Sequence, residues 1–258
     1  MTQEQKLDFL IDYLIDENIK FKQMKSPQNL DDKKDLFRSL CNVREPKEVS
    51  KDFLKIQNEY LKAEIEQKGI VNYRDIAKTE ANNIYLWQGD ITSLKVDAIV
   101  NAGNSKLLGC FYPLHNCIDN AIHSFAGVEL RNECYKIMNK QGEDEKMGFA
   151  KITKAYNLPS KNVIHTVGPI VRGQLSDKNI LDLVSCYEEC LKLADSYKLK
   201  SIAFCCISTG EYCFPNVEAG EIAVSTVKNY LLKTNSEIEV VFNVFKEIDY
   251  EIYKRLLY

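Results

Sequence analysis

The sequence predicts an α/β fold, because short strand-like runs alternate with helical patterns along most of the chain. Runs of β-branched and aromatic residues predict strands at 84–87, 96–100, 163–167, 202–206 and 238–245. Helical periodicity separates or follows them at about 117–139, 178–197, 217–232 and 247–256. This alternation is typical of a sheet that helices cover on both faces. In such folds ligands bind beyond the carboxyl ends of the strands, so the loops there are expected to carry the function.

The first 80 residues differ from the rest, because only helices are expected in them. They contain one of the 11 glycines, one of the nine cysteines and none of the three histidines. Apolar residues recur at helical spacing around 7–15, 36–40 and 53–65. We therefore divide the chain into an N-terminal helical extension, 1–80, and an α/β domain, 81–258, and expect the extension to pack against the domain.

Composition excludes several classes of protein. The 258 residues are 45% hydrophobic and 28% charged, which provides a full core and excludes a disordered or collagen-like chain. No apolar run approaches the roughly 18 residues of a membrane span, and the first 20 residues lack the pattern of a signal peptide. We therefore expect a cytoplasmic protein with reduced cysteines. A net charge of −3 predicts no capture of nucleic acid or membrane, and we expect a monomer.

A candidate metal site follows the predicted strand 96–100. Cys110, His115 and Cys117 fall within eight residues, with the spacing C-x4-H-x-C. Two thiolates and one imidazole suit zinc, and three ligands without an obvious fourth favour an open, catalytic site. The alternative is that the two cysteines pack against the first turn of a helix and His115 lies on the surface.

Two further loops at strand ends are candidates for ligand binding. Residues 207–215 place small hydroxyl residues and a glycine between a strand and a helix that starts near a proline, so backbone N–H groups can converge on an anion. The chain has no Walker A ending and no G-x-G-x-x-G, which disfavours nucleoside triphosphates and ordinary dinucleotide redox chemistry. Asp90, after strand 84–87, either accepts from an adenine amine or caps a turn. His123 and His165 are expected to be core or cleft-wall histidines.

In this order, the loops resemble the macrodomain family of ADP-ribose-binding modules over about residues 84–245. The segments that carry the resemblance are Gly89 to Thr92, Val96 to Asn104, Asp119 to His123, Tyr156 to Pro169 and Ile202 to Pro215. Where many hydrolytic macrodomains have a run of glycines, this chain has Gly109 to Cys117. That insertion resembles the zinc-containing microbial branch, whose members are protein-ADP-ribose hydrolases with an N-terminal helical extension. The resemblance implies a three-layer mixed sheet between helices and one zinc ion on Cys110, His115 and Cys117.

The resemblance also implies which residues hold ADP-ribose. Asp90 is expected to bind the adenine amine, and Ile91 to add a backbone contact. Asn104 is expected to contact the distal ribose. The diphosphate and the ribose beyond it are expected to be wrapped by Ser208, Thr209, Gly210, Glu211 and Tyr212, and the same end to be lined by Cys117, Ile118, Asp119 and Asn120.

The implied reaction is zinc-dependent removal of mono-ADP-ribose from a modified protein, with cleavage between the distal ribose and the side chain. Asp119, Asn104 and Cys117 are the candidate catalytic residues. The zinc that Cys117 helps to hold is expected to fix and polarise a ribose hydroxyl, and Asp119 to orient that hydroxyl or act as general base. An ester to Asp or Glu is the expected linkage, because a carboxylate is a good leaving group.

Three other functions remain open at this point. The chain could be a reader that binds ADP-ribosylated proteins without cleaving them. It could be an esterase that acts on O-acetyl-ADP-ribose, which would need the same residues. The zinc could also be purely structural, in which case Cys213 or Cys134 is the candidate fourth ligand.

Overall fold

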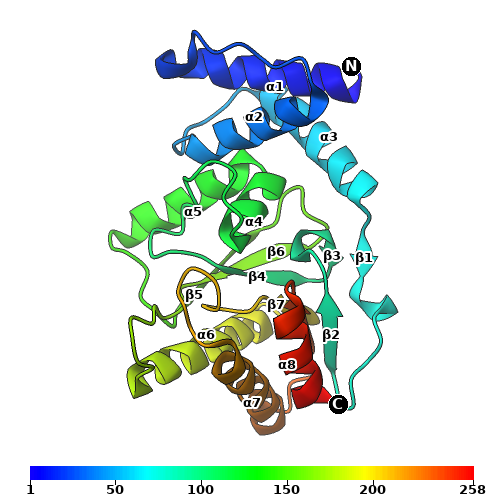
Figure 1. The fold of residues 1–258 in the computed structure, drawn as a ribbon, viewed down its shortest axis with the longest axis vertical. Coiled ribbons are helices and arrows are strands. Elements are labelled where there is room, and N and C mark those ends of the chain that lie inside the picture. Colours follow the sequence, from blue (N-terminus) through cyan, green and yellow to red (C-terminus); the bar gives the residue numbers. More distant parts are fainter.

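A computed structural model describes all 258 residues and shows a mixed six-stranded sheet between two layers of helices (Figure 1). Neighbouring strands are parallel except for the last pair, which is antiparallel. The α/β prediction and the three-layer mixed sheet are confirmed. The strands follow one another across the sheet as β2 (Ile84–Gln88), β8 (Glu239–Val244), β7 (Ser201–Phe204), β4 (Ala98–Ala102), β6 (Asn162–Thr166) and β5 (Ala150–Lys154).

The helices divide between the two faces of the sheet. On one face, α4 (Ile118–Ala126) packs on β4 and α5 (Val128–Gln141) on β5. On the other face lie α6 (Asp177–Ser196), α7 (Asn216–Thr234) and α8 (Glu247–Leu257). Because both faces are covered, the central strands are continuously apolar, and Ile99 and Val100 of β4 are fully buried. None of the helices combines the length and the apolar character that a membrane span requires.

Besides the short strands β1 (Val71–Asn72) and β3 (Leu94–Lys95), which were not predicted, two longer elements differ from the sequence-based expectation. The single helix expected at 117–139 is two helices, because Gly127 between them adopts φ +94°, and a Cβ atom there would lie 2.6 Å from the Gln57 side chain. The edge strand β5 was not predicted. Its segment, Ala-Lys-Ile-Thr-Lys, alternates apolar and polar residues too briefly to distinguish it from a loop.

The N-terminal extension forms a helical layer beyond α4 and α5 (Figure 1). Its helices are α1 (Gln3–Glu17), α2 (Leu30–Val43) and α3 (Lys51–Lys68). They enclose a hydrophobic cluster of 11 buried residues, all from positions 7–61 except Val128 of α5. Ile65, on the last turns of α3, already belongs to the main core, so α3 joins the two cores. The extension packs on α4 through α2 and α3, and its boundary at residue 80 stays a prediction.

Short elements lie between the longer helices and strands, within the extension and on either side of β2. A two-stranded ladder joins β1 (Val71–Asn72) to β3 (Leu94–Lys95). Three single-turn 3-10 helices are η1 (Ile19–Phe21), η2 (Tyr73–Asp75) and η3 (Ile91–Ser93), the last of which follows β2 at the carboxyl edge of the sheet.

Candidate functional site

The loops that follow β4 and β7 meet at the carboxyl edge of the sheet. His115, in the loop after β4, has its Nε2 atom 3.6 Å from Oε1 of Glu211 in the loop after β7. Burial raises the pKa of Tyr212, and the nearby Asp119 and Cys117 raise it further. The fold thus brings together two segments that the sequence separates by about 90 residues.

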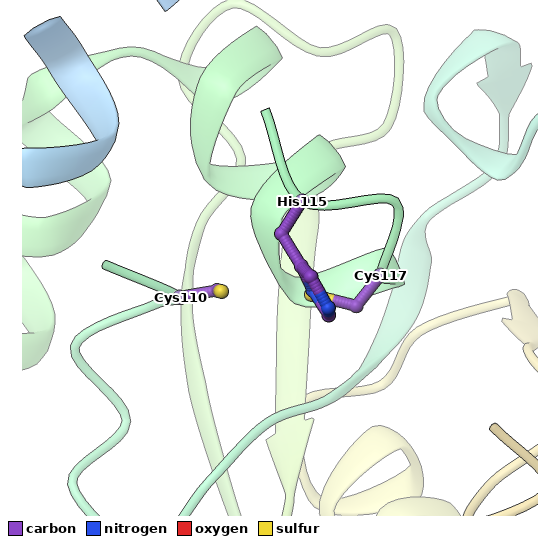
Figure 2. Close-up of side chains that lie close together, drawn as sticks. All are labelled: Cys110, His115 and Cys117. Carbon is purple, nitrogen blue, oxygen red and sulfur yellow. The ribbon is translucent and has the colours of Figure 1, made fainter. Parts of the chain in front are cut away.

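The three predicted metal ligands lie together in the loop after β4, which we call the metal loop (residues 108–117). The ligand atoms of Cys110, His115 and Cys117 all lie within 4.8 Å of one another. Figure 2 shows the His115 ring beside Cys117, with Cys110 facing both from the opposite side of the loop. Nδ1 of His115 is buried without a hydrogen-bond partner. Burial raises the pKa of the Cys117 thiol to about 12. The hydrogen bond from the Asn120 N–H lowers this pKa, whereas the nearby Cys110 and Asp119 raise it.

This donor set fits a zinc ion. Two sulfur atoms and one unpaired imidazole nitrogen are soft and borderline ligands of the kind zinc prefers, and a cation would relieve the mutual repulsion of two thiolates. Neither proposed fourth ligand joins the cluster: Cys213 is exposed in the next loop, and Cys134 lies in a separate group. Three protein ligands therefore leave a position open.

Cys117 also starts α4. Its Sγ atom accepts a hydrogen bond of 3.4 Å from the Asn120 N–H, as the cap of the helix. The expectation that a cysteine packs against the first turn of a helix is thus met by one of the two cysteines. Capping and metal ligation both use the sulfur lone pairs, so the two interpretations of Cys117 are compatible.

Asp119, the second residue of α4, is a buried carboxylate beside the metal loop. Only 5% of the residue is exposed. Its Oδ1 atom accepts a hydrogen bond of 2.8 Å from the Asn101 amide, and Nε2 of His123 lies 3.5 Å from the same oxygen. Burial raises the pKa of Asp119 to about 6, although the Asn101 bond opposes this. Oδ1 is therefore occupied, whereas Oδ2 makes no hydrogen bond within the protein.

Asn101 is a site residue to which the sequence analysis gave no role. Its Nδ2 group donates to Asp119 and also to Nδ1 of His165, 3.1 Å away. Since Nδ1 accepts, the proton of the neutral ring is on Nε2, which donates to the Thr153 hydroxyl at 3.0 Å. The sequence feature that could have identified Asn101 as a site residue is its place near the end of β4, directly before Ala102-Gly103-Asn104.

His123, Cys134 and His165 form a second group of close ligand atoms, but they do not fit a metal. All three are buried and lie within 4.8 Å of one another. A metal ion could bind His165 only through an unprotonated and unoccupied ring nitrogen. Nδ1 accepts from Asn101, and Nε2 carries the ring proton, which it donates to Thr153. Burial lowers the pKa of His165 to about 3, so the ring is neutral. His165 is the satisfied core histidine that its strand position predicted, whereas neither ring nitrogen of His123 makes a hydrogen bond.

The 208–212 loop presents unpaired backbone donors. The N–H groups of Ser208, Gly210, Glu211 and Tyr212 donate to no protein acceptor. The loop is nevertheless fixed, because Phe214 N–H donates to the Ser208 carbonyl and Val171 N–H to the Tyr212 carbonyl. Ser208 adopts φ +66°, and its buried hydroxyl also lacks a partner. Consecutive free donors in a fixed turn are what an anion needs.

Asp90 caps the short helix η3, as one of its two interpretations predicted. Its Oδ1 atom accepts from the N–H and the hydroxyl of Thr92, at 2.9 and 2.7 Å. Its Oδ2 atom pairs with Lys68 of α3, whose ammonium lies 4.1 Å from the centre of the Phe125 ring. Burial raises the pKa of Asp90, but the bonds from Lys68 and Thr92 outweigh it, so the pKa is lowered and the group stays ionised.

An exposed aromatic residue beside Asp90 also escaped the sequence analysis. Phe245 follows β8 and is 76% exposed. It lies beside the Gly89-Asp90 turn, because Gly89 N–H donates to the Val244 carbonyl at 2.9 Å. The sequence analysis placed Phe245 at the end of the predicted strand 238–245, and an aromatic residue at that strand end was the available signal.

Three of the residues predicted to contact ADP-ribose are buried or hydrogen-bonded within the protein itself. The Asn104 amide accepts from Lys106 N–H at 3.0 Å and donates to the Gly109 carbonyl at 3.2 Å, so it shapes the start of the metal loop. Ile91 is buried as the first residue of η3. The Asn120 side chain is fully buried and donates to the Tyr112 carbonyl, and the Asn120 N–H donates to Sγ of Cys117.

Comparison with known proteins places this site in a family. The Macro domain family model matches residues 100–223. A protein from Treponema medium, named "Protein-ADP-ribose hydrolase", is 51% identical over the whole length of both chains. The chain belongs to the macrodomain family. A Trypanosoma brucei macrodomain in complex with ADP-ribose superposes with a TM-score of 0.66 at 28% identity, covering 86% of this macrodomain chain and 95% of the other.

A second solved macrodomain superposes on a smaller part of the chain. The Oceanobacillus iheyensis macrodomain with ADP gives a TM-score of 0.62 at 38% identity, covering 69% of this chain and 92% of that one. The Oceanobacillus structure thus leaves 31% of this macrodomain chain without a counterpart, whereas the trypanosome structure leaves 14% of it.

Proposed function

We propose that this macrodomain is a zinc-dependent hydrolase that removes mono-ADP-ribose from modified proteins. The observation that carries the proposal is one juxtaposition: an open three-ligand metal set, the buried carboxylate of Asp119 and a fixed loop of free N–H donors at one edge of the sheet. The Treponema relative that carries the name of this activity is similar over its full length, and the trypanosome structure contains ADP-ribose. We infer a cytoplasmic monomer.

ADP-ribose would lie along the carboxyl edge of the sheet. Asp90 offers an ionised carboxylate to the adenine amine, and Phe245 offers an exposed ring on which the base can stack. The free N–H groups of the 208–212 loop would hold the diphosphate without a basic field, in agreement with the net charge of −3. In this arrangement the distal ribose would lie near the metal loop and Asp119.

Cys110, His115 and Cys117 would hold the zinc ion, which supplies Lewis-acid polarisation of a ribose hydroxyl when bound. Asn101 fixes Oδ1 of Asp119, so Oδ2 is free to accept a proton from that hydroxyl or from the attacking water. In the expected ester, the bond from the ribose to the side-chain oxygen breaks and water oxygen replaces it. The Asp or Glu side chain leaves as a carboxylate, and the water proton passes to Asp119. Asn104 donates a hydrogen bond to the Gly109 carbonyl and would thereby keep the metal loop beside the ribose.

The test is release of ADP-ribose from a mono-ADP-ribosylated protein, measured for zinc-loaded wild type, chelator-treated wild type and Cys110→Ser. Cys110 makes no helix cap, so its substitution removes a ligand with little structural effect. Cys213→Ser, in the exposed loop nearby, is the matched control. We expect turnover only by loaded wild type and the control, while all samples stay folded and bind ADP-ribose.

The other outcomes identify the alternatives. Binding without turnover in every sample would make the protein a reader of ADP-ribosylation. Unfolding on metal removal would indicate a structural zinc. Faster release of acetate from O-acetyl-ADP-ribose than of ADP-ribose from protein would favour the esterase.

A further inference from the structure

The N-terminal extension contacts the metal loop directly, through the helix α2. The Arg38 guanidinium donates to the His115 carbonyl at 3.1 Å, and to the Asn120 side-chain oxygen at 3.1 Å from Nε and 2.8 Å from Nη2. These two acceptors lie on either side of Cys117, two residues before it and three after it. One planar group thus spans the segment that contains two of the three ligands.

A second residue of α2 fixes the turn before His115. Asn42 is 1% exposed. Its Oδ1 atom accepts from the Leu114 N–H at 3.0 Å, and its Nδ2 group donates to Ser124 of α4 at 3.0 Å. Leu114 has φ +54°, a conformation that costs energy for a leucine and persists only where neighbouring bonds impose it.

The start of the metal loop is tied to the same helix. Arg131 of α5 donates from Nε to the Leu108 carbonyl at 2.6 Å, and from Nη1 to the carbonyls of Cys41 and Asn42 at 2.8 and 2.9 Å. Its guanidinium also lies 4.3 Å from the centre of the Phe111 ring. Arg131 therefore caps the C-terminal end of α2 with the same side chain that holds the loop. Both ends of the metal loop are anchored to the extension.

We propose that the extension is part of the metal site, and that Arg38 and Asn42 are positioning residues that set its affinity for zinc. A loop held in the ligating conformation before the metal arrives does not lose conformational entropy when the metal binds. Partners that orient metal ligands are typically worth about 10-fold to 100-fold in metal affinity. This inference rests on the zinc site of the proposed function and assigns the role of helices that are otherwise outside the site.

The first experiment measures zinc dissociation constants by competition with a chromophoric chelator, using full-length protein. Arg38→Gln is expected to weaken zinc binding by about 10-fold or more. Arg38→Lys keeps the charge but cannot span both acceptors, so it is also expected to bind zinc more weakly than wild type. The matched control is Lys34→Gln, one turn earlier on α2, because Lys34 pairs with Glu64 of α3 and does not touch the loop. It is expected to bind zinc as wild type does.

Thermal unfolding of the metal-free proteins separates positioning from general stabilisation. A merely structural Arg38 would lower the melting temperature of the metal-free variant and leave its zinc affinity unchanged. That result would overturn the inference, as would wild-type affinity in Arg38→Lys. Wild-type protein that binds no zinc would overturn the metal site and the inference together. Equal affinities of Arg38→Gln and Lys34→Gln would overturn the inference alone.

A second experiment needs no variant and holds even if Arg38→Gln fails to fold. Because coupling between two sites is reciprocal, zinc added to wild type should slow amide hydrogen exchange in α2, residues 30–43. Helix α7, residues 216–234, on the opposite face of the sheet, is the internal control and should not change. Slower exchange in the metal loop with no change in α2 would refute the coupling.

Discussion

Acid should destabilise this protein through the buried, neutral ring of His165. His165 is fully buried, and its Nδ1 atom accepts from Asn101, the residue that also holds Asp119. Protonation would place a second hydrogen between Nδ1 and the Asn101 amide and would charge a ring that has no water around it. The native state therefore resists the proton, whereas the unfolded chain takes it with an ordinary histidine pKa.

The size of the effect follows from the two pKa values. The folded pKa of His165 is about 3, against 6.5 for the free side chain, and burial is the cause. Since the folded pKa is lowered, the stability is fully present above pH 6.5 and is lost as the pH falls below it. For one such histidine, the loss between pH 7.5 and pH 5 is about 2 kcal/mol. Burial also lowers the pKa of His123, which adds to the loss.

The assay is urea unfolding at pH 7.5 and pH 5, followed by the fluorescence of Trp87, the only tryptophan of the chain. Chelator is present throughout, so that metal binding does not contribute. The comparison is with His165→Asn, whose amide oxygen can still accept from Asn101. The variant is expected to be less stable at both pH values, but its loss between them should be about 2 kcal/mol smaller than that of wild type. Equal losses in the two proteins would refute the assignment.

Three other substitutions test the site and the cores. Gly168→Ala would place a Cβ atom 2.1 Å from the Ser208 hydroxyl oxygen, which should displace the 208–212 loop. ADP-ribose binding, measured by calorimetry, should weaken about tenfold or more. Unchanged affinity would contradict the role of that loop. Phe245→Ala should weaken ADP-ribose binding by roughly 1–3 kcal/mol without lowering the melting temperature, because the ring is 76% exposed, and full affinity would rule out stacking. Phe53→Ala, fully buried in the extension, should cost about 3–5 kcal/mol in urea unfolding; a loss under 1 kcal/mol would show that the extension adds little to global stability.

Local patterns predicted five of the six strands of the sheet and the group of Cys110, His115 and Cys117. Strands and helices of the α/β domain follow from apolar periodicity, because a covered parallel sheet needs continuous apolar strands between amphipathic helices. Cys110, His115 and Cys117 could be predicted because they lie within eight residues, where one loop suffices to bring them together. The free donors of the 208–212 loop follow from the same local chemistry of a strand-to-helix turn.

Only the tertiary structure decided what surrounds these groups. The bond from Arg38 to the His115 carbonyl joins residues 77 apart, and the bond from Asn101 to His165 joins residues 64 apart. The sequence placed Asp90 after a strand, but only the fold showed that its Oδ2 atom pairs with Lys68. Such hydrogen bonds and ion pairs leave no periodicity, because they depend on which surfaces meet after the helices pack. The sequence by itself therefore predicted five of the six strands and the cysteine and histidine side chains of the metal loop, while packing of the extension against α4 and α5 decided how that loop is held.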